Sequence, residues 1–308
     1  MKKQVVVAFL LGLVLPLAML ELMKPDQELA VETEETEHTQ PRETRLRVLC
    51  DNTVTEMELE EYITGVVLSE MPADFCEEAL KAQAVVARTY ALKRLEQGSK
   101  HEDYSLCDDP SCCQGYRSPQ SYLEEGGTGE GVEKIAQAVE DTAGLVLKYE
   151  GKLIDATYFS CSGGRTEAAV EVWGADVPYL QAVDSPGEEI AAHDTDEAIF
   201  ALEEFARLTG CAGDPNQWVG KITHTQGGGV DTIELCGQTY EGTELRKLLG
   251  LRSTDFTLEI GQDRVTVTTR GFGHRVGMSQ YGAEAMARQG SSFREILSHY
   301  YPGTELVE

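Results

Sequence analysis

The chain contains 308 residues, of which 41% are hydrophobic and 26% are charged, as in an ordinary folded protein. It carries 53 Asp and Glu against 26 Lys and Arg, a formal net charge of −27. Nucleic acid and anionic lipid surfaces repel such a protein, which excludes them as partners. A neutral or cationic partner, such as a polysaccharide, is compatible with this charge.

The N-terminus has the pattern of a membrane anchor. Lys2 and Lys3 precede an uncharged run over residues 5–20, which as a helix spans about 24 Å, slightly less than the roughly 30 Å of a bilayer core. A cleaved signal peptide is the alternative, but no small-x-small cleavage site follows the run. We therefore expect an uncleaved anchor over residues 1–23. The lysines then stay cytoplasmic and the rest of the chain is exported, which makes it a single-pass protein of the cell membrane.

Residues 24–44 are acidic and contain no aromatic side chain, which is typical of a flexible linker. The folded domain is expected over residues 45–308. Its first elements are a hairpin over residues 45–50 and 53–59, turning at Asp51-Asn52, and then a helix from Glu60.

Apolar periodicity and turn residues divide the remainder of the chain. Residues 99–130 read as a loop. The patterns predict helices over residues 77–95, 132–142, 195–209, 241–249, 283–289 and 293–300, and strands over residues 145–149, 152–158, 219–226, 230–235, 257–260 and 264–269. Helices and strands alternate without regular βαβ order, so the fold class is α+β, with short antiparallel strands and mixed helices around a substrate groove.

Glu70 is a carboxylate at a helix break. It closes the first helix just before Met71 and Pro72, and the second helix carries Lys81 and Arg88 on one side. Such a carboxylate facing two cations suits acid–base chemistry. An ordinary helical hairpin with a solvated glutamate gives the same pattern.

Two glycine-containing loops carry hydrogen-bonding side chains suited to a sugar. They read FSCSGGRT over residues 159–166, and RGFGHRVGMSQYGA over residues 270–283. The candidate contacts are Ser160, Ser162, His274, Gln280 and Tyr281. The alternatives are a solvated turn for the first loop and a tight structural loop for the second.

The eight cysteines are unevenly spaced. Cys107, Cys112 and Cys113 fall within seven residues, a spacing more typical of a metal site than of structural disulfides. With His101 they offer four ligands, the number of a closed tetrahedral zinc site. A disulfide such as Cys107–Cys113 and free thiols remain alternatives. The other cysteines have no assignable partner, so core packing is the default for Cys76, Cys161, Cys211 and Cys236.

Taken together, these segments resemble the stage II sporulation protein D family. The resemblance runs in order over roughly residues 45–306. Its motifs are EEYITGVVLSEMPADFCEEALKAQAVVARTYAL, ATYFSCSGGRTE, GFGHRVGMSQYGAEAMA and HYYPGTEL.

The resemblance implies a lytic transglycosylase of peptidoglycan. Such an enzyme breaks the bond between N-acetylmuramic acid and N-acetylglucosamine while the muramic C6 hydroxyl closes on C1, and it prefers strands stripped of stem peptides. Implied partners are glycan strands, the sporulation amidase stage II sporulation protein P and the membrane protein stage II sporulation protein M. The implied place is the septal intermembrane space during engulfment.

Glu70 matches the family's catalytic glutamate. Because the substrate supplies its own nucleophile, one carboxylate can act as acid and then as base, provided that burial raises its pKa. By resemblance Lys81 and Arg88 supply groove electrostatics and orient the substrate, although Arg88 fits a buried ion pair equally well. His274 is read as a loop-fixing or substrate residue.

Three features of the sequence have more than one interpretation: the metal of the His/Cys set, the role of Arg275, and a second carboxylate near Glu70. Some family members carry a similar His/Cys set that binds zinc, so the resemblance favours a zinc ion that is structural or adjacent to the substrate. Arg275 stands where the family loop has glycine, which implies ordinary dihedral angles there, a shifted loop, or an added groove cation. Glu167 or Asp155, if close to Glu70, would supply a second carboxylate.

Two functions of other classes compete with the transglycosylase. One is a non-catalytic glycan-binding module that enhances an amidase. The other is a zinc hydrolase built on the His101 cluster, which is weakened because the four ligands leave no open coordination position for water.

Overall fold

The computed structural model describes residues 44–98 and 100–308. The expected anchor over residues 1–23 and nearly all of the expected linker over residues 24–44 lie outside this part. No helix within the described residues is long and apolar enough to cross a bilayer. Residues Glu43–Glu308 form one compact unit, and its mixture of helices and short strands confirms the α+β class.

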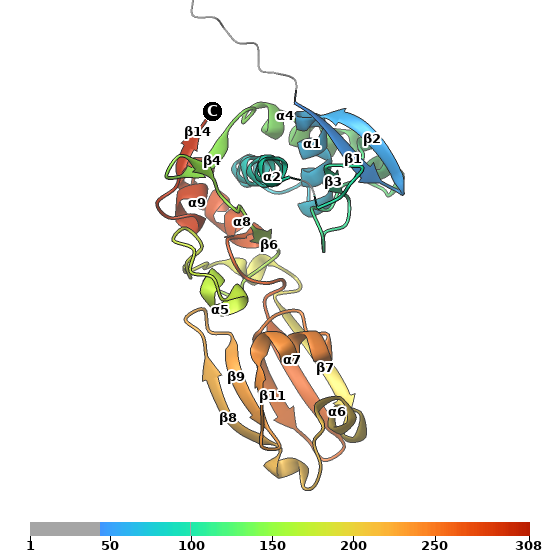
Figure 1. Cartoon of the computed structure of the whole chain (residues 1–308), viewed down its shortest axis with the longest axis vertical. Coiled ribbons are helices and arrows are strands. Elements are labelled where there is room, and N and C mark those ends of the chain that lie inside the picture. The colour runs from blue at the N-terminus through green and yellow to red at the C-terminus, as the bar shows by residue number, and fades with distance from the viewer. Residues whose placement is uncertain (1–43, 99) are drawn as a thin grey trace, which may run out of the picture. The chain divides into compact units, whose positions relative to one another are not determined.

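The long helix α2 (Glu77–Gln97) forms the centre of the first hydrophobic core. It packs against α1 (Leu59–Glu70), α4 (Gly129–Glu140), α8 (Gln280–Arg288) and α9 (Phe293–Tyr300) (Figure 1). Alanines make up much of the buried surface of α2, and their small side chains let the surrounding helices approach closely. Residues within 46–180 and 276–301 contribute to this core, so it brings together the N-terminal and C-terminal parts of the described chain.

Short strands border this helical core. The predicted hairpin is confirmed: β1 pairs antiparallel with β2, and Asp51 and Asn52 turn with φ of 49° and 61°. The strands here are β1 (Arg45–Cys50), β2 (Thr53–Glu58), β3 (Leu106–Cys107), β4 (Val146–Tyr149), β5 (Lys152–Leu153), β6 (Tyr158–Phe159), β13 (Met278–Ser279) and β14 (Glu305–Val307), and the short helices are α3 (Pro119–Glu124) and α5 (Ala169–Trp173). The expected loop over residues 99–130 therefore contains β3 and α3.

A second hydrophobic core forms from residues 205–267, an insertion between the two halves of the first. Two three-stranded sheets build it, in the orders β11-β12-β7 and β10-β9-β8. Its elements are β7 (Thr195–Ala201), α6 (Leu202–Thr209), β8 (Val219–His224), β9 (Val230–Leu235), β10 (Gln238–Glu241), α7 (Gly242–Leu249), β11 (Asp255–Ile260) and β12 (Arg264–Arg270), with a 3-10 turn at Pro215–Gln217. A second 3-10 turn, Glu188–Ile190, precedes them and packs against α8.

The helix predicted over residues 195–209 is wrong in its first half. Residues Thr195–Ala201 form β7, which pairs antiparallel with β12, and only Leu202–Thr209 is helical. Ala198 and Phe200 alternate along β7 and pack against the second core. The pairing partner and this half-buried face override the helix-forming composition of the segment.

Cys211 and Cys236 form a disulfide within the second core, with Cα atoms 5.4 Å apart. The default of unpaired core packing is therefore wrong for these two residues. They lie 25 residues apart in the sequence, and only the folded sheets bring them together. The bridge closes the segment that holds Trp218, whose ring stacks on Phe205 with centroids 6.1 Å apart.

Arg275 corrects another expectation. It has φ of 66° and is 1% exposed, so it occupies the left-handed backbone region that a glycine would favour, and it is no groove cation. Its guanidinium pairs with the fully buried Glu167 at 3.2 Å. It also donates to the carbonyl oxygens of Ser162 at 2.7 Å and Gly227 at 2.8 Å. These charge-assisted bonds offset the backbone strain and tie three loops together.

Candidate functional site

Glu70 lies at the last position of α1 because of the residues that follow it. Pro72 disfavours helical backbone at the preceding residue, and Met71 accordingly has φ of −129° and ψ of 142°. The helix therefore ends at Glu70, while Tyr62, Val66 and Val67 of the same helix stay in the core. The carboxylate projects from a rigid element at the edge of that core.

The surroundings of Glu70 favour its protonated form. Burial raises the pKa of Glu70, and hydrogen bonds from Gly115, Gln280 and Tyr158 oppose that rise without cancelling it. The Gly115 N–H donates to Oε1 at 3.1 Å, and the Gln280 side-chain amide donates to Oε2 at 3.4 Å. The carboxyl group is thus oriented by two neighbours and can hold a proton closer to neutral pH than a solvated glutamate.

Gly115 permits this arrangement by its size. A Cβ at that position would lie 2.8 Å from Ser69 Oγ and 2.9 Å from Glu70 Oε1, closer than real Cβ atoms come. The backbone of the loop after the cysteine cluster can therefore approach the carboxylate only because residue 115 is glycine.

Glu70 lines a cavity of about 890 Å³. Four predicted site residues meet there, Glu70, Ser160, His274 and Gln280, together with Cys112 and Cys113 of the predicted metal cluster. Further lining residues are Tyr90, Arg94, Lys100, Pro110, Ser111, Gln114, Thr157, Tyr158, Phe159, Trp173, Arg246, Phe272 and Gly273. Segments far apart in sequence thus form one concave site, the usual form of a small-molecule or oligosaccharide site.

The structure does not bring Lys81 and Arg88 into this cavity. Lys81 pairs with Asp141 at 2.8 Å. Arg88 is fully buried, pairs with Glu60 at 2.6 Å and donates to two backbone carbonyl oxygens. The alternative of a buried ion pair therefore describes Arg88, and neither cation lies where a ligand beside Glu70 would meet it.

Ser162 and Tyr281 also lie outside the cavity. The Ser162 hydroxyl is fully buried and donates to Glu188 at 2.7 Å. The Tyr281 ring packs edge-on against Phe75 and His193, with centroids 5.1 Å away in both pairs. Both residues support the loops that carry the site. Ser160, in contrast, lines the cavity and bonds to the His193 ring at 2.8 Å.

His274 is held as a neutral ring. Burial, reinforced by the nearby Arg246 cation, lowers the pKa of His274 to about 4. Its Nδ1 accepts the Val276 N–H at 3.2 Å, which assigns the remaining proton to Nε2. The ring also donates to the backbone of Tyr158. The residue therefore fixes its own loop in the cavity wall, and at neutral pH its ring is uncharged.

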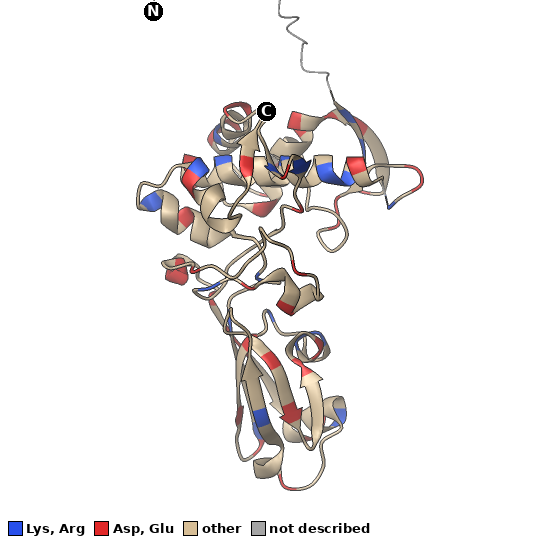
Figure 2. Cartoon of the chain, turned by 60° about the vertical axis from the view of Figure 1, so that its left-hand side comes forward, with Lys and Arg blue, Asp and Glu red and all other residues tan. Residues whose placement is uncertain are grey.

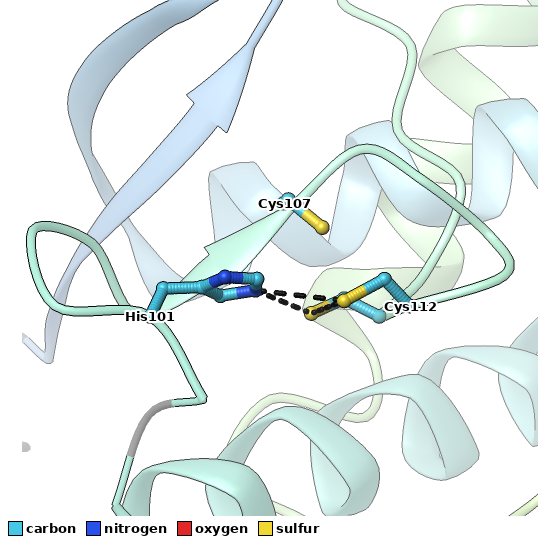
Figure 3. A group of neighbouring side chains, drawn as sticks. His101, Cys107 and Cys112 are labelled. Atoms are coloured by element: carbon cyan, nitrogen blue, oxygen red, sulfur yellow. Dashed lines mark hydrogen bonds between the residues drawn. The ribbon is translucent and has the colours of Figure 1, made fainter.

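The predicted His/Cys cluster forms next to the cavity. The ligand atoms of His101, Cys107, Cys112 and Cys113 all lie within 4.8 Å of one another. Figure 3 shows the side chains of His101, Cys107 and Cys112 pointing toward one another. His101 Nε2 is 3.6 Å from the sulfurs of Cys112 and Cys113, which are 3.9 Å apart. All three cysteines are free thiols in this structure.

Neither of the two possible second carboxylates lines the cavity. Glu167 is enclosed in its ion pair with Arg275, and Asp155 lies 3.8 Å from Arg94. Glu70 is therefore the one carboxylate in the cavity wall among the described residues.

Sequence reasoning missed the cations and the large aromatic residue of the cavity, which are Arg94, Lys100, Arg246 and Trp173. Arg94 lies in the last turn of the predicted helix and Lys100 follows it, both at the far end from Glu70, and Arg246 lies on α7 beside the second core. No local pattern marks them, since their proximity to Glu70 arises from the packing of distant segments.

Known proteins are similar in sequence to this chain. A family described as Stage II sporulation protein matches residues 51–149. Stage II sporulation protein D of Bacillus subtilis (strain 168) is 42% identical over 264 residues, which cover 84% of this chain and 77% of that protein. The chain belongs to the stage II sporulation protein D family.

Two further proteins are similar in sequence to this chain. Stage II sporulation protein D of Bacillus amyloliquefaciens is 41% identical over 84% of this chain and 76% of its own length. A protein named amidase enhancer, from Bacillus subtilis (strain 168), is 30% identical over 80% of this chain but only 40% of its own length. The stage II sporulation protein D family thus has relatives whose names point both to sporulation and to an amidase.

Proposed function

We propose that the protein is a lytic transglycosylase that cuts peptide-stripped glycan strands of peptidoglycan during sporulation. One observation carries this proposal: Glu70 is the one carboxylate that lines the cavity among the described residues, and its pKa is raised. Ordinary glycosidases need a second carboxylate to activate water or to act as nucleophile. A transglycosylase does not, because its substrate carries the nucleophile.

The proposed reaction uses Glu70 twice. Its protonated carboxyl group first donates the proton to the glycosidic oxygen as the bond from that oxygen to muramic C1 breaks. The resulting carboxylate then takes the proton of the muramic C6 hydroxyl while that oxygen bonds to C1, which restores the acid. Gly115 and Gln280 hold the carboxyl group, Ser160 offers a hydrogen bond to the sugar, and the neutral His274 ring lines the wall beside it.

Zinc fits the His/Cys cluster as a structural ion. In a tetrahedral zinc site, sulfurs lie about 3.8 Å from each other and about 3.6 Å from a ligand nitrogen. The distances of 3.9 Å and 3.6 Å match these edges. His101, Cys107, Cys112 and Cys113 would hold the ion, which would then clamp the loop that carries Gly115. Four protein ligands close the coordination sphere, so no step of the reaction is assigned to the metal.

The proposed setting follows from the family and the N-terminal pattern. An anchor over residues 1–23 would hold the domain outside the cytoplasm, and the disulfide between Cys211 and Cys236 suits an oxidising compartment. Septal peptidoglycan in the intermembrane space would be the substrate. The amidase stage II sporulation protein P would strip the strands, with the membrane protein stage II sporulation protein M as a further partner.

The relative named amidase enhancer supports a second candidate, a glycan-binding module without catalysis of its own. Product analysis on peptide-free glycan separates the two. We expect the wild type to produce 1,6-anhydromuramic ends and Glu70→Gln to be slower by about 10²- to 10⁴-fold, the usual contribution of a general acid. The wild-type rate should also fall as pH rises through the raised pKa of Glu70, because the acid form is lost.

Each other outcome has a definite meaning. Reducing ends would make the protein a hydrolase. Equal activity of both proteins would remove Glu70 from the mechanism. Glycan binding without any cleavage, by a protein that stimulates the amidase, would establish the binding module.

A further inference from the structure

The Glu70 cavity has a charge opposite to that of the whole protein. Its lining contains three cations, Arg94, Lys100 and Arg246, and the single carboxylate of Glu70, whose raised pKa reduces its charge. The chain as a whole carries −27, and its acidic and basic residues are spread over the described elements (Figure 2). A net positive wall in such a protein favours an anionic group on the ligand.

Of the three cations, Arg246 gives the strongest indication of an anionic ligand. It lies in the last turn of α7 and is half-buried, yet within the described part of the chain no carboxylate lies within ion-pair distance of it. The one hydrogen bond of its guanidinium there goes from Nε to the Leu251 carbonyl oxygen at 3.3 Å. A partly buried guanidinium without a counter-ion is costly, because lost hydration is not replaced.

Arg94 and Lys100 belong to other segments of the cavity wall. Arg94 stacks on Tyr90 at 4.7 Å, donates from Nη1 to the Gln97 side chain at 3.0 Å, and is only loosely paired with Asp155 at 3.8 Å. Lys100 is exposed and reaches the Cys112 carbonyl oxygen at 3.5 Å. Both cations thus keep donors that a ligand can use.

The neighbouring pocket has the opposite character. It has a volume of about 380 Å³ and shares Trp173 with the Glu70 cavity. Its wall contains the carboxylates Glu171, Asp231 and Glu241 and no Lys or Arg. A glycan strand that passes over Trp173 would contact both pockets. An anionic group on that glycan is repelled by the carboxylates of the smaller pocket and attracted by the cations of the Glu70 cavity.

We propose that Arg246, together with Arg94 and Lys100, binds a carboxylate of the substrate, namely the lactyl carboxylate of muramic acid. This assignment rests on the proposed action on glycan strands. While the stem peptide is attached, the lactyl group is an uncharged amide. Removal of the peptide exposes the carboxylate, so the cations would select stripped strands by charge. The stem peptide also carries carboxylates, which the same cations could bind.

The test measures binding in the Glu70→Gln background, where turnover does not interfere. Calorimetric titrations use three probes: peptide-free glycan, the same glycan with its lactyl carboxyls converted to methylamides, and glycan with intact stem peptides. We expect Arg246→Gln to weaken binding of the first probe by about 10- to 100-fold and to leave the second unchanged. The first probe should also bind more tightly than the third.

Controls separate charge recognition from damage to the fold. Arg264→Gln removes an exposed arginine that pairs with Asp263 and should change nothing. Arg246→Lys should restore part of the affinity, and thermal unfolding should show that each variant folds. Equal loss on the charged and the methylamide probes, or no loss on either, would overturn the proposal. Arg246-dependent binding of the third probe at least as tight as that of the first would assign the site to the stem peptide instead.

Two outcomes of these measurements distinguish a failure of the carboxylate site from a failure of the transglycosylase. If the wild type fails to cleave any strand while the charge-dependent binding persists, the transglycosylase is wrong and the carboxylate site stands. If cleavage proceeds through Glu70 but Arg246→Gln binds both glycan probes like its parent, the carboxylate site is wrong and the enzyme stands.

Discussion

At the residue scale, the acid–base candidate depends on a few short contacts around one carboxylate. Glu70 owes its position to Pro72, which ends the helix, and its raised pKa to burial. Its orientation depends on Gly115, whose backbone N–H reaches the carboxylate from a different loop. Small changes at these positions should therefore alter the chemistry more than the stability.

We expect Gly115→Ala to reduce glycan cleavage by about 10- to 100-fold. The new methyl group would overlap Glu70 Oε1 and Ser69 Oγ, so the carboxylate must move from its present place. Gly129→Ala is the matched control, because a methyl group there meets no atom within 4 Å. Steady-state rates on peptide-free glycan, with melting temperatures measured alongside, make the comparison. An active Gly115→Ala protein would show that the carboxylate tolerates displacement.

At the scale of elements, the loops around the site are joined by a buried ion pair. Arg275 and Glu167 are both about 1% exposed, and the arginine also bonds to carbonyl oxygens of neighbouring loops. Glu167 accepts further bonds from the Gly229 N–H at 3.1 Å and the Thr225 hydroxyl at 2.7 Å. The pair thus connects the first core with the insertion that forms the second.

We expect Arg275→Met to lower the free energy of unfolding by about 3–5 kcal/mol, because it leaves the Glu167 carboxylate buried without its cation. Arg264→Met, which breaks an exposed pair, should cost at most about 1 kcal/mol. Urea denaturation measures both values. The double variant with Glu167→Gln should lose less than the sum of the single losses. Additive losses would mean that the two side chains do not act as a pair.

Prediction of elements from the sequence succeeded where the signal was local. The hairpin at Asp51-Asn52 and the helix ending at Glu70 follow from turn residues and from Pro72. It failed at Thr195–Ala201, where helix-forming residues take a strand because β12 offers a pairing edge. Lys81 and Arg88 share one side of α2 as expected, but that side meets Asp141 and Glu60 of other helices.

At the scale of the whole molecule, the His/Cys cluster lies beside the Glu70 cavity, so the proposed metal bears on the proposed chemistry. Its loop pairs with β1 through β3, contains Cys112 and Cys113 of the cavity wall, and leads directly to Gly115. A bound ion would therefore support Glu70 through the loop. On the proposed function, the metal would then affect activity without taking part in the reaction.

We expect about one zinc ion per chain by elemental analysis, and a melting temperature at least about 5 °C lower after chelation. Cleavage should fall with the loss of metal, and the product should remain anhydromuramic. Cys107→Ser should lose the zinc, whereas Cys50→Ser, outside the cluster, should keep it. A metal-free wild type with an unchanged melting temperature would refute the zinc site.

The features readable from the chain are those encoded within a few residues. Pro72 ends a helix at Glu70, and a thirteen-residue segment contains all four residues of the His/Cys cluster. Packing between distant segments produced the rest: it buried Arg275 and Arg88, joined Cys211 to Cys236, and placed Arg246 in the same cavity wall as Glu70. Local periodicity contains no information about such partners, since the free energy that selects them comes from burial and charge pairing across the folded chain.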